Sequence, residues 1–246
     1  MLKTFSITNI GKKRKTNQDF VYTSEQQVGM LPNLFLVADG MGGHNAGDYA
    51  SKMTVETIVE KISASAETER RLILEEAILA ANTRVRQEAK NHPELEGMGT
   101  TIVAAICEGG ELFVANVGDS RLYVENKREI IQVTRDHSWV EEMVQRGGIP
   151  RAEARNNEHK NIITRAVGAE DTVQIDYFKI TLEEDDTILM CTDGLTNMLE
   201  DEEIRMILES SRDIVEKAEK LVWAANERGG SDNISVILIE PVRNTD

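Results

Sequence analysis

Hydrophobic and polar positions alternate along the chain in blocks that predict both strands and helices. Short apolar runs bounded by Gly, Asp or Pro are typical of buried strands, and apolar residues at helical spacing predict amphipathic helices. Short polar connections between several strands require antiparallel pairing. The pattern predicts strands at 34–38, 100–107, 112–117, 121–124, 130–133, 174–180, 187–192 and 234–239, and helices at about 46–62, 67–90 and 212–227. We therefore expect an α+β fold with sheet packed on sheet and helices outside.

The blocks follow one another without a linker. The chain contains only four prolines, and no repeat of fixed period divides it. Residues 137–163 are polar and predict a short helix followed by an exposed excursion. We interpret residues 1–246 as a single domain.

The net charge of the chain and the length of its apolar runs exclude some classes of function. The chain has 28 Lys and Arg against 43 Asp and Glu, a formal net charge of −15, which argues against nucleic-acid binding because phosphate contacts need clustered cations. The longest apolar runs are about seven residues, against the roughly 20 that a membrane span needs. The N-terminus lacks the pattern of a secretion signal, and Cys107 and Cys191 lie in apolar runs typical of buried thiols. These features favour a cytoplasmic protein that binds neither nucleic acid nor membranes.

Four aspartates stand at the ends of predicted buried strands. Asp39 and Asp193 each end an apolar run and precede glycine, Asp119 follows a third run, and Asp232 comes just before the last strand. Antiparallel strands could bring all four to one edge of a sandwich. Each Asp-Gly pair alone has a simpler interpretation as a plain turn, because glycine permits tight backbone geometry.

Carboxylates gathered at such an edge would repel one another and resist burial. A hard divalent cation resolves that conflict, and Mg²⁺, Mn²⁺ and Ca²⁺ all prefer oxygen ligands. The carbonyl of Gly40 could add a further oxygen, and Asp19 is a fifth acid near a strand start. Arg14 could bind a phosphate through two parallel hydrogen bonds, although a solvated surface arginine is the alternative. The glycine-rich segment 40–47 does not match a nucleotide-binding fingerprint.

Seven short motifs occur in a fixed order along the chain. They are Arg14-Lys15-Thr16-Asn17-Gln18-Asp19, Asp39-Gly40-Met41-Gly42-Gly43-His44, Gly99-Thr100-Thr101, Gly118-Asp119-Ser120-Arg121, Asp136-His137-Ser138, Cys191-Thr192-Asp193-Gly194-Leu195 and Ser231-Asp232-Asn233-Ile234. In this order the chain resembles the metal-dependent serine/threonine protein phosphatases of the protein phosphatase 2C type, in their short bacterial form. The resemblance covers essentially the whole chain.

The resemblance implies a four-layer αββα sandwich, two antiparallel sheets flanked by helices, with a manganese or magnesium centre in a cleft between the sheets. Carried onto this sequence, Asp39 would bridge two ions, and Asp193 and Asp232 would complete the first site. The carbonyl of Gly40 would serve the second ion, which Asp19 would reach through water. The expected cofactor is Mn²⁺ or Mg²⁺, two or three per chain.

Further roles follow from the same resemblance. Asp119 together with Asp193 would bind a third ion, and Arg14 would hold the substrate phosphate. The polar segment at about 145–163 would form a flap beside the cleft. His44 lies three residues after the position where eukaryotic members carry a histidine, and it could act as the acid for the leaving group or merely shape the entrance.

The implied reaction is hydrolysis of phosphoserine and phosphothreonine in proteins by a hydroxide that bridges the ions, opposing a bacterial Ser/Thr kinase. Phosphoprotein substrates and a cognate kinase are the expected partners, and a monomer is the expected state. Two alternatives stay open. One is a regulatory binding domain of the same fold with weak or no turnover, and the other is a phosphatase dedicated to an anti-sigma-factor antagonist.

Overall fold

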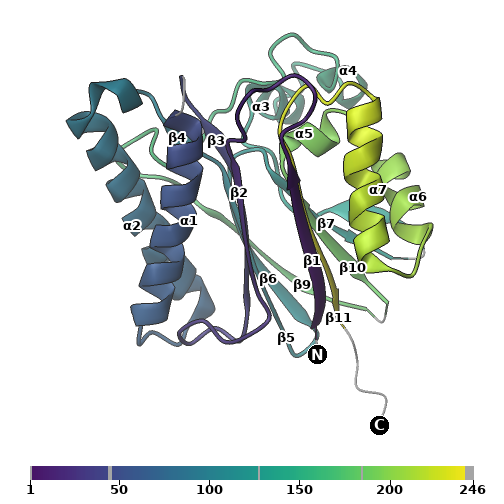
Figure 1. The fold of residues 1–246 in the computed structure, drawn as a ribbon, viewed down its shortest axis with the longest axis horizontal. Coiled ribbons are helices and arrows are strands. Elements are labelled where there is room, and N and C mark those ends of the chain that lie inside the picture. Colours follow the sequence, from purple (N-terminus) through teal and green to yellow (C-terminus); the bar gives the residue numbers. More distant parts are fainter. Residues whose placement is uncertain (1, 44–45, 127, 184, 242–246) are drawn as a thin grey trace.

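The chain folds into four layers in which two central sheets are covered by helices on their outer faces (Figure 1). The computed structural model describes residues 2–43, 46–126, 128–183 and 185–241. The strands pair antiparallel throughout these residues. The predicted α+β class and the αββα layering are confirmed.

The first sheet places the first and last strands of the chain side by side, whereas the main path of the second sheet follows chain order. The first sheet has the order β1 (Leu2–Asn9), β11 (Ile234–Pro241), β10 (Thr187–Cys191), β7 (Arg121–Glu125) and β8 (Ile130–Gln132). The second has the order β2 (Asp19–Ser24), β3 (Leu34–Met41), β5 (Ile102–Glu108), β6 (Glu111–Val117) and β9 (Asp176–Thr181), and the short β4 (Gly99–Thr100) pairs with the end of β3. The apolar pattern did not predict β1, which is completed only by pairing with β11 at the other end of the chain.

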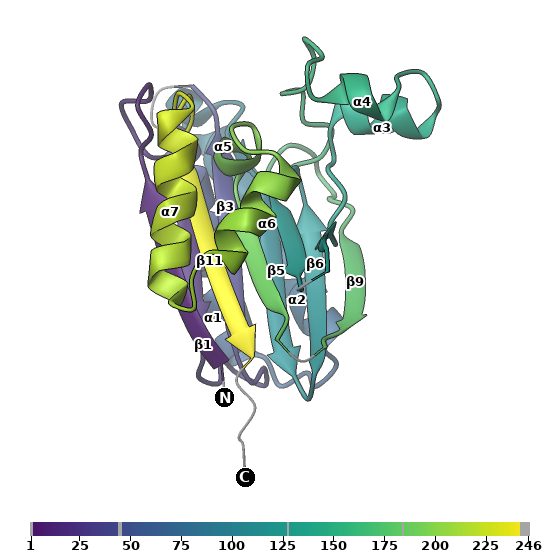
Figure 2. The ribbon, with the colours of Figure 1, turned by 90° about the vertical axis from the view of Figure 1, so that its right-hand side faces the viewer.

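Two groups of helices cover the sheets, and a third group stands apart. Helices α1 (Ala46–Ala64) and α2 (Arg70–Asn91) cover the second sheet, and α5 (Asp193–Thr196), α6 (Asp201–Glu209) and α7 (Ile214–Glu227) cover the first. Helices α3 (Trp139–Gln145) and α4 (Arg151–Ala154) project from one corner of the sandwich (Figure 2), and a 3-10 turn, η1 (Pro93–Leu95), follows α2. None of the helices within the described ranges has the length and apolar character that crossing a bilayer requires.

Local sequence accounts for where several helices begin and end. The side chain of Asp213 accepts hydrogen bonds from the backbone amides of Val215 and Glu216 and caps α7. That helix stops before Gly229 and Gly230, both of which have positive φ. Helix α6, which the apolar pattern did not predict, begins at a capping box between Glu200 and Glu203.

The space between the two sheets is filled by residues that alternate along the strands with those facing the helices. Phe35 and Val37 of β3 belong to this inter-sheet core, whereas Leu36 and Ala38 pack toward α1 and α2. At one end of the sheets the same alternation continues into polar residues. The positions that extend the inter-sheet face are Asp39 on β3, Thr101 before β5, Asn116 on β6, Ser120 before β7, Thr192 after β10 and Ser235 on β11. The inter-sheet core is therefore capped at one end by buried polar groups.

Candidate active site

Asp19 and Asp39 are direct partners across the β2–β3 pairing, so strand register alone puts these two carboxylates side by side. The backbone around Asp39 is held from both sides. Its amide is hydrogen-bonded to the Thr101 hydroxyl at 2.9 Å, and its carbonyl accepts from the Thr100 hydroxyl at 2.8 Å. The amide of Gly40 donates to the carbonyl of Gln18 at 3.0 Å.

Asp193 and Asp232 come from the other sheet, through two closely opposed loops. Asp193 opens α5 directly after β10, and Asn197 donates to its Oδ2 at 2.8 Å. A Cβ added to Gly194 would lie 1.8 Å from the carbonyl oxygen of Asn233 and 3.4 Å from the Cβ of Asp232. Only a glycine after Asp193 lets the two aspartate loops approach this closely.

The glycines after Asp39 and Asp193 do not serve the purpose that their sequence suggested. We expected tight turns, but β3 continues to Met41, and neither Gly40 nor Gly194 has a positive φ. A Cβ on Gly40 would lie 1.9 Å from the carbonyl oxygen of Gly47 in α1. Both glycines are therefore required by close backbone contact rather than by turn geometry.

Asp119 follows β6 through Gly118 and is 7% exposed. The neighbouring His137 has a structural role. Its Nδ1 accepts a hydrogen bond from the Gly118 amide at 3.0 Å, and its Nε2 lies 3.1 Å from a carboxylate oxygen of Asp176. Burial lowers the pKa of His137. The neutral ring thus ties the backbone before Asp119 to the start of β9.

Asp19 is oriented by two hydroxyl groups of the opposite sheet. Its Oδ2 accepts from the Ser235 hydroxyl at 2.7 Å and from the Thr192 hydroxyl at 2.9 Å. The Ser235 hydroxyl is also hydrogen-bonded to that of Thr8, at 2.8 Å. The other oxygen, Oδ1, is buried and has no hydrogen-bond partner among the described residues, and the same is true of Oδ1 of Asp193. Two carboxylate oxygens at this site therefore lack the partners that burial demands.

Asp19, Asp39, Asp119 and Asp193 resist ionisation. Burial raises the pKa of Asp19 to about 7 and that of Asp193 to about 6, with further upward contributions from neighbouring aspartates. Burial, together with the charges of Asp19 and Asp193, raises the pKa of Asp39 well above its ordinary value. The pKa of Asp119 is raised by burial and by the charge of Asp193. Such a cluster is stable as a set of anions only when positive charge is placed among them.

Arg14 supplies part of that positive charge. Its Nη2 lies 2.7 Å from Oδ2 of Asp232, and its side chain is 48% exposed. Asn233 anchors the loop that carries Arg14. Its side-chain nitrogen, Nδ2, donates to the carbonyls of Ile10 and Thr16 at 2.9 and 3.0 Å. Arg14 therefore stands at the open rim of the cluster, on a loop anchored beside Asp232.

Two further predictions concern the role of His44 and the binding of metal ions by the aspartates. His44 lies outside the described residues, so its role stays a prediction. Within those residues, no set of three or more His, Cys, Asp or Glu side chains is arranged to hold a metal ion by itself. Asp232 is turned toward Arg14 and toward the amide of Asn233, which donates to its Oδ1 at 2.8 Å.

The model of a family described as protein phosphatase 2C matches residues 11–235. The chain belongs to this family. The serine/threonine phosphatase Stp of Listeria welshimeri is 42% identical over 214 residues, which make up 84% of this chain and 84% of the relative. The crystal structure of the serine/threonine phosphatase Stp1 from Staphylococcus aureus has a TM-score of 0.92 at 33% identity, covering 99% of this chain and 96% of that one. The crystal structure of the catalytic domain of the phosphatase PstP in complex with two manganese ions has a TM-score of 0.85 at 30% identity, covering 98% and 99%.

Membership of the protein phosphatase 2C family confirms the predicted family and enzyme class, a protein serine/threonine phosphatase. The prediction omitted the side chains that hold the aspartates of this phosphatase in place, chiefly Thr192, Ser235 and Asn233. A signal for the first two was present. The alternation of Ile188 and Met190 continues into Thr192, and that of Ile239 and Ile237 continues into Ser235. A hydroxyl at the next inward-facing position marks the point where an apolar core meets a polar site.

Proposed function

We propose that this protein hydrolyses phosphoserine and phosphothreonine in other proteins, using Mn²⁺ or Mg²⁺ held by the aspartate cluster. The observation that carries the proposal is the set of buried and half-buried carboxylates from both sheets, two of which have a buried oxygen without a hydrogen-bond partner among the described residues. PstP, with the same fold, has been crystallised with two manganese ions. The ligands in this chain would be Asp19, Asp39, Asp119, Asp193, Asp232 and the carbonyl of Gly40.

The residues present fit divalent cations. The donors are all oxygens, and the raised pKa values of Asp19 and Asp193 reflect charge repulsion and burial that a cation would relieve. Because no three His, Cys, Asp or Glu side chains of the described residues converge on one point, an ion would be held by pairs of carboxylates completed by the Gly40 carbonyl and water. Asp232 would join them by giving up part of its contact with Arg14. When bound, the ions supply positive charge at the transferring phosphoryl group and an activated water.

Arg14 would bind the phosphate of the substrate. Its guanidinium is at the rim of the cluster, half exposed, and already oriented by Asp232. Two parallel N–H donors match two phosphate oxygens and would place the phosphorus above the carboxylates. The developing negative charge would then be opposed by this arginine from the open side.

Hydrolysis of p-nitrophenyl phosphate by the purified protein tests the proposal. We expect turnover that requires added Mn²⁺ or Mg²⁺, is lost with a chelator, and falls at least 100-fold in an Asp193→Asn variant that still folds. Glu202→Gln, a change of one exposed carboxylate on α6, is the matched control and should keep full activity. Absence of metal-dependent turnover, or full turnover by Asp193→Asn, would refute the proposal and favour a binding domain without catalysis.

The finer points of the function are also proposals. We propose that a cognate kinase phosphorylates its substrates, and that the segment at about 145–163, which carries α4, flanks the entrance as a flap. The number of ions is testable by calorimetric titration with MnCl₂. Loss of one equivalent in Asp119→Asn would assign that aspartate to a third ion, and an unchanged number would exclude this role. Sedimentation equilibrium tests whether the single domain is a monomer.

A further inference from the structure

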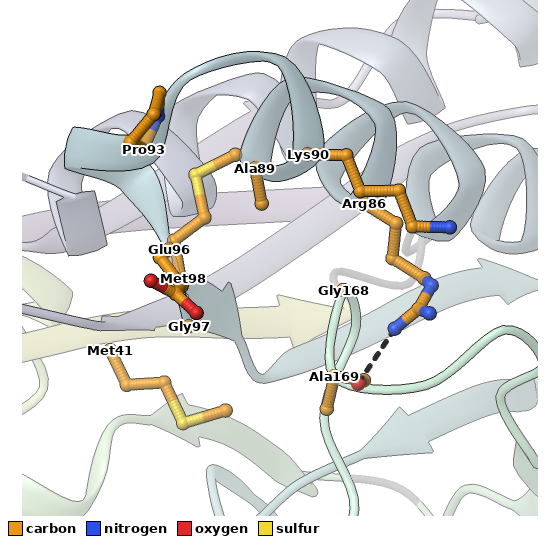
Figure 3. Close-up of a pocket in the computed structure, with 10 residues that line it drawn as sticks. All are labelled: Met41, Arg86, Ala89, Lys90, Pro93, Glu96, Gly97, Met98, Gly168 and Ala169. Atoms are coloured by element: carbon orange, nitrogen blue, oxygen red, sulfur yellow. Dashed lines mark hydrogen bonds between the residues drawn. The ribbon is translucent and has the colours of Figure 1, made fainter.

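A depression with an apolar floor begins next to the aspartate cluster. It has a volume of about 560 Å³ and lies between the C-terminal half of α2, the segment after it, and the turn at Gly168 and Ala169 (Figure 3). We call it the Met41 pocket, after the residue that joins it to the site. Its apolar lining consists of Met41, Ala89, Pro93, Met98 and Ala169.

Met41 connects the pocket to the strand that carries Asp39. Met41 follows Asp39 by two residues on β3, so strand alternation puts both side chains on the same side of the strand, about 7 Å apart. Gly99 is the partner of Met41 on β4, and a Cβ added there would lie 2.9 Å from Cε of Met41. Glycine at 99 thus lets the thioether lie across β4, where it extends toward Ala169 (Figure 3).

The walls of the pocket are set by tight packing, and its mouth is open. Met98 is 1% exposed and runs up against α2 near Ala89 (Figure 3). On the opposite wall Gly168 has a φ of 91°, and a Cβ there would lie 2.4 Å from Cγ1 of Val85. Gly97 is exposed at the mouth, and among the described residues a Cβ added there would meet no atom within 4 Å.

One cation at the rim is already engaged and so shapes the pocket. Nη1 of Arg86 donates to the carbonyl of Ala169 at 2.8 Å, and its Nη2 lies 2.5 Å from Oδ1 of Asp171. These contacts anchor the turn at Ala169 to α2. The guanidinium therefore closes one side of the pocket. Lys90 and Glu96 also line it, and the apolar part of the lining lies between these charged side chains.

We propose that the Met41 pocket binds an apolar side chain of the phosphoprotein substrate, carried within about three residues of the phosphorylated Ser or Thr. This inference rests on the proposed function. An extended peptide advances about 3.3–3.6 Å per residue, so a side chain two to three residues from a phosphate held at the cluster can reach Met41, which lies two residues along β3 from Asp39 and forms one edge of the pocket. The flexible thioether of the half-buried Met41 adapts to side chains of different shape, which suits Leu, Met, Ile or Phe. Binding in this pocket would make the enzyme selective for the sequence around the phosphorylated residue, whereas the phosphate site contacts only the phosphoester.

Phosphoserine peptides with a single Leu placed in turn at each of the three positions on either side of phosphoserine test the inference. With the Mn²⁺-loaded protein, we expect kcat/KM to rise about tenfold when Leu replaces Ser at one of these positions. Ala89→Phe, which fills the pocket from α2, should abolish that preference. Ala80→Phe is the matched control, because Ala80 is also half-buried on α2 but lies outside the pocket. Ala169→Phe fills the pocket from the other wall and serves if Ala89→Phe fails to fold.

Hydrolysis of p-nitrophenyl phosphate separates the two proposals, because this substrate is too small to reach the pocket. Its kcat/KM should stay within twofold in Ala89→Phe and Ala169→Phe. Normal turnover of p-nitrophenyl phosphate with equal rates on all peptides would overturn the inference and leave the proposed function intact. A Leu preference that survives in both filled variants would overturn it as well. Loss of metal-dependent turnover in the unmodified protein would instead refute the proposed function.

Discussion

Removal of the Ser235 hydroxyl should weaken metal binding without breaking the fold. In Ser235→Ala, Asp19 loses one of the two hydroxyl donors to its Oδ2, the one at 2.7 Å, and keeps Thr192 at 2.9 Å. A hydrogen bond to a charged group contributes about 1.5–3 kcal/mol, so Mn²⁺ affinity should fall roughly 10- to 150-fold at the site that uses Asp19. The loss also raises the pKa of Asp19 further above about 7, so protons compete more strongly with the ion at neutral pH.

Calorimetric titration with MnCl₂ at pH 7 and pH 8.5 measures this effect. The loss of Mn²⁺ affinity in Ser235→Ala should be smaller at pH 8.5 than at pH 7. At the higher pH fewer protons compete with Mn²⁺ for Asp19, whereas the cost of the missing hydrogen bond remains. Thr8→Val is the control. It removes the 2.8 Å hydrogen bond between the Thr8 and Ser235 hydroxyls and the 2.7 Å one that Thr8 accepts from Asn17, and it spares the one from Ser235 to Asp19. We expect Thr8→Val to bind Mn²⁺ within twofold of the unmodified protein. Equal Mn²⁺ affinity in Ser235→Ala and Thr8→Val would refute the reasoning.

Three further predictions concern the phosphate, the protons and the backbone of the site. Arg14→Ala should weaken inhibition by inorganic phosphate about tenfold with little change in melting temperature, because the side chain is 48% exposed; an unchanged inhibition constant would contradict its role. The metal-free protein should lose stability relative to Asp19→Asn as pH rises from about 4 to about 8. Burial raises the pKa of Asp19 to about 7 in the fold, against about 3.9 when unfolded, so the folded state retains a proton that the unfolded chain releases. Urea denaturation at both pH values measures the difference in unfolding free energy between the two proteins. A difference that does not change with pH would contradict the raised pKa of Asp19. Gly194→Ala should cost about 3 kcal/mol of stability and weaken Mn²⁺ binding, because its Cβ would lie 1.8 Å from the carbonyl oxygen of Asn233; an unchanged urea midpoint would show that the loops can separate.

The sequence alone was sufficient for the class of fold and for the class of enzyme. Apolar runs of strand length with short connections predict antiparallel sheets, and helical spacing at 46–62 and 212–227 predicts two of the covering helices. These signals are local, because the spacing of apolar residues within a short segment shows which face of a strand or helix is buried. Asp39 and Asp193 stand out because a carboxylate at the end of an apolar strand is costly unless something binds it.

Tertiary structure decided how those residues meet. The register of β2 on β3 pairs Asp19 with Asp39, and β1, which its own sequence does not mark clearly, is defined by pairing with β11 over 200 residues away. Neither the need for glycine at 194 nor the contact of Ser235 with Asp19 follows from any short segment. The physical reason is that close backbone approach and hydrogen-bond geometry depend on packing between elements that are distant in sequence. The sequence therefore determined which polar groups this phosphatase places at the end of its core. Only the folded sandwich decided which of these groups contact one another and which hydrogen bonds they form.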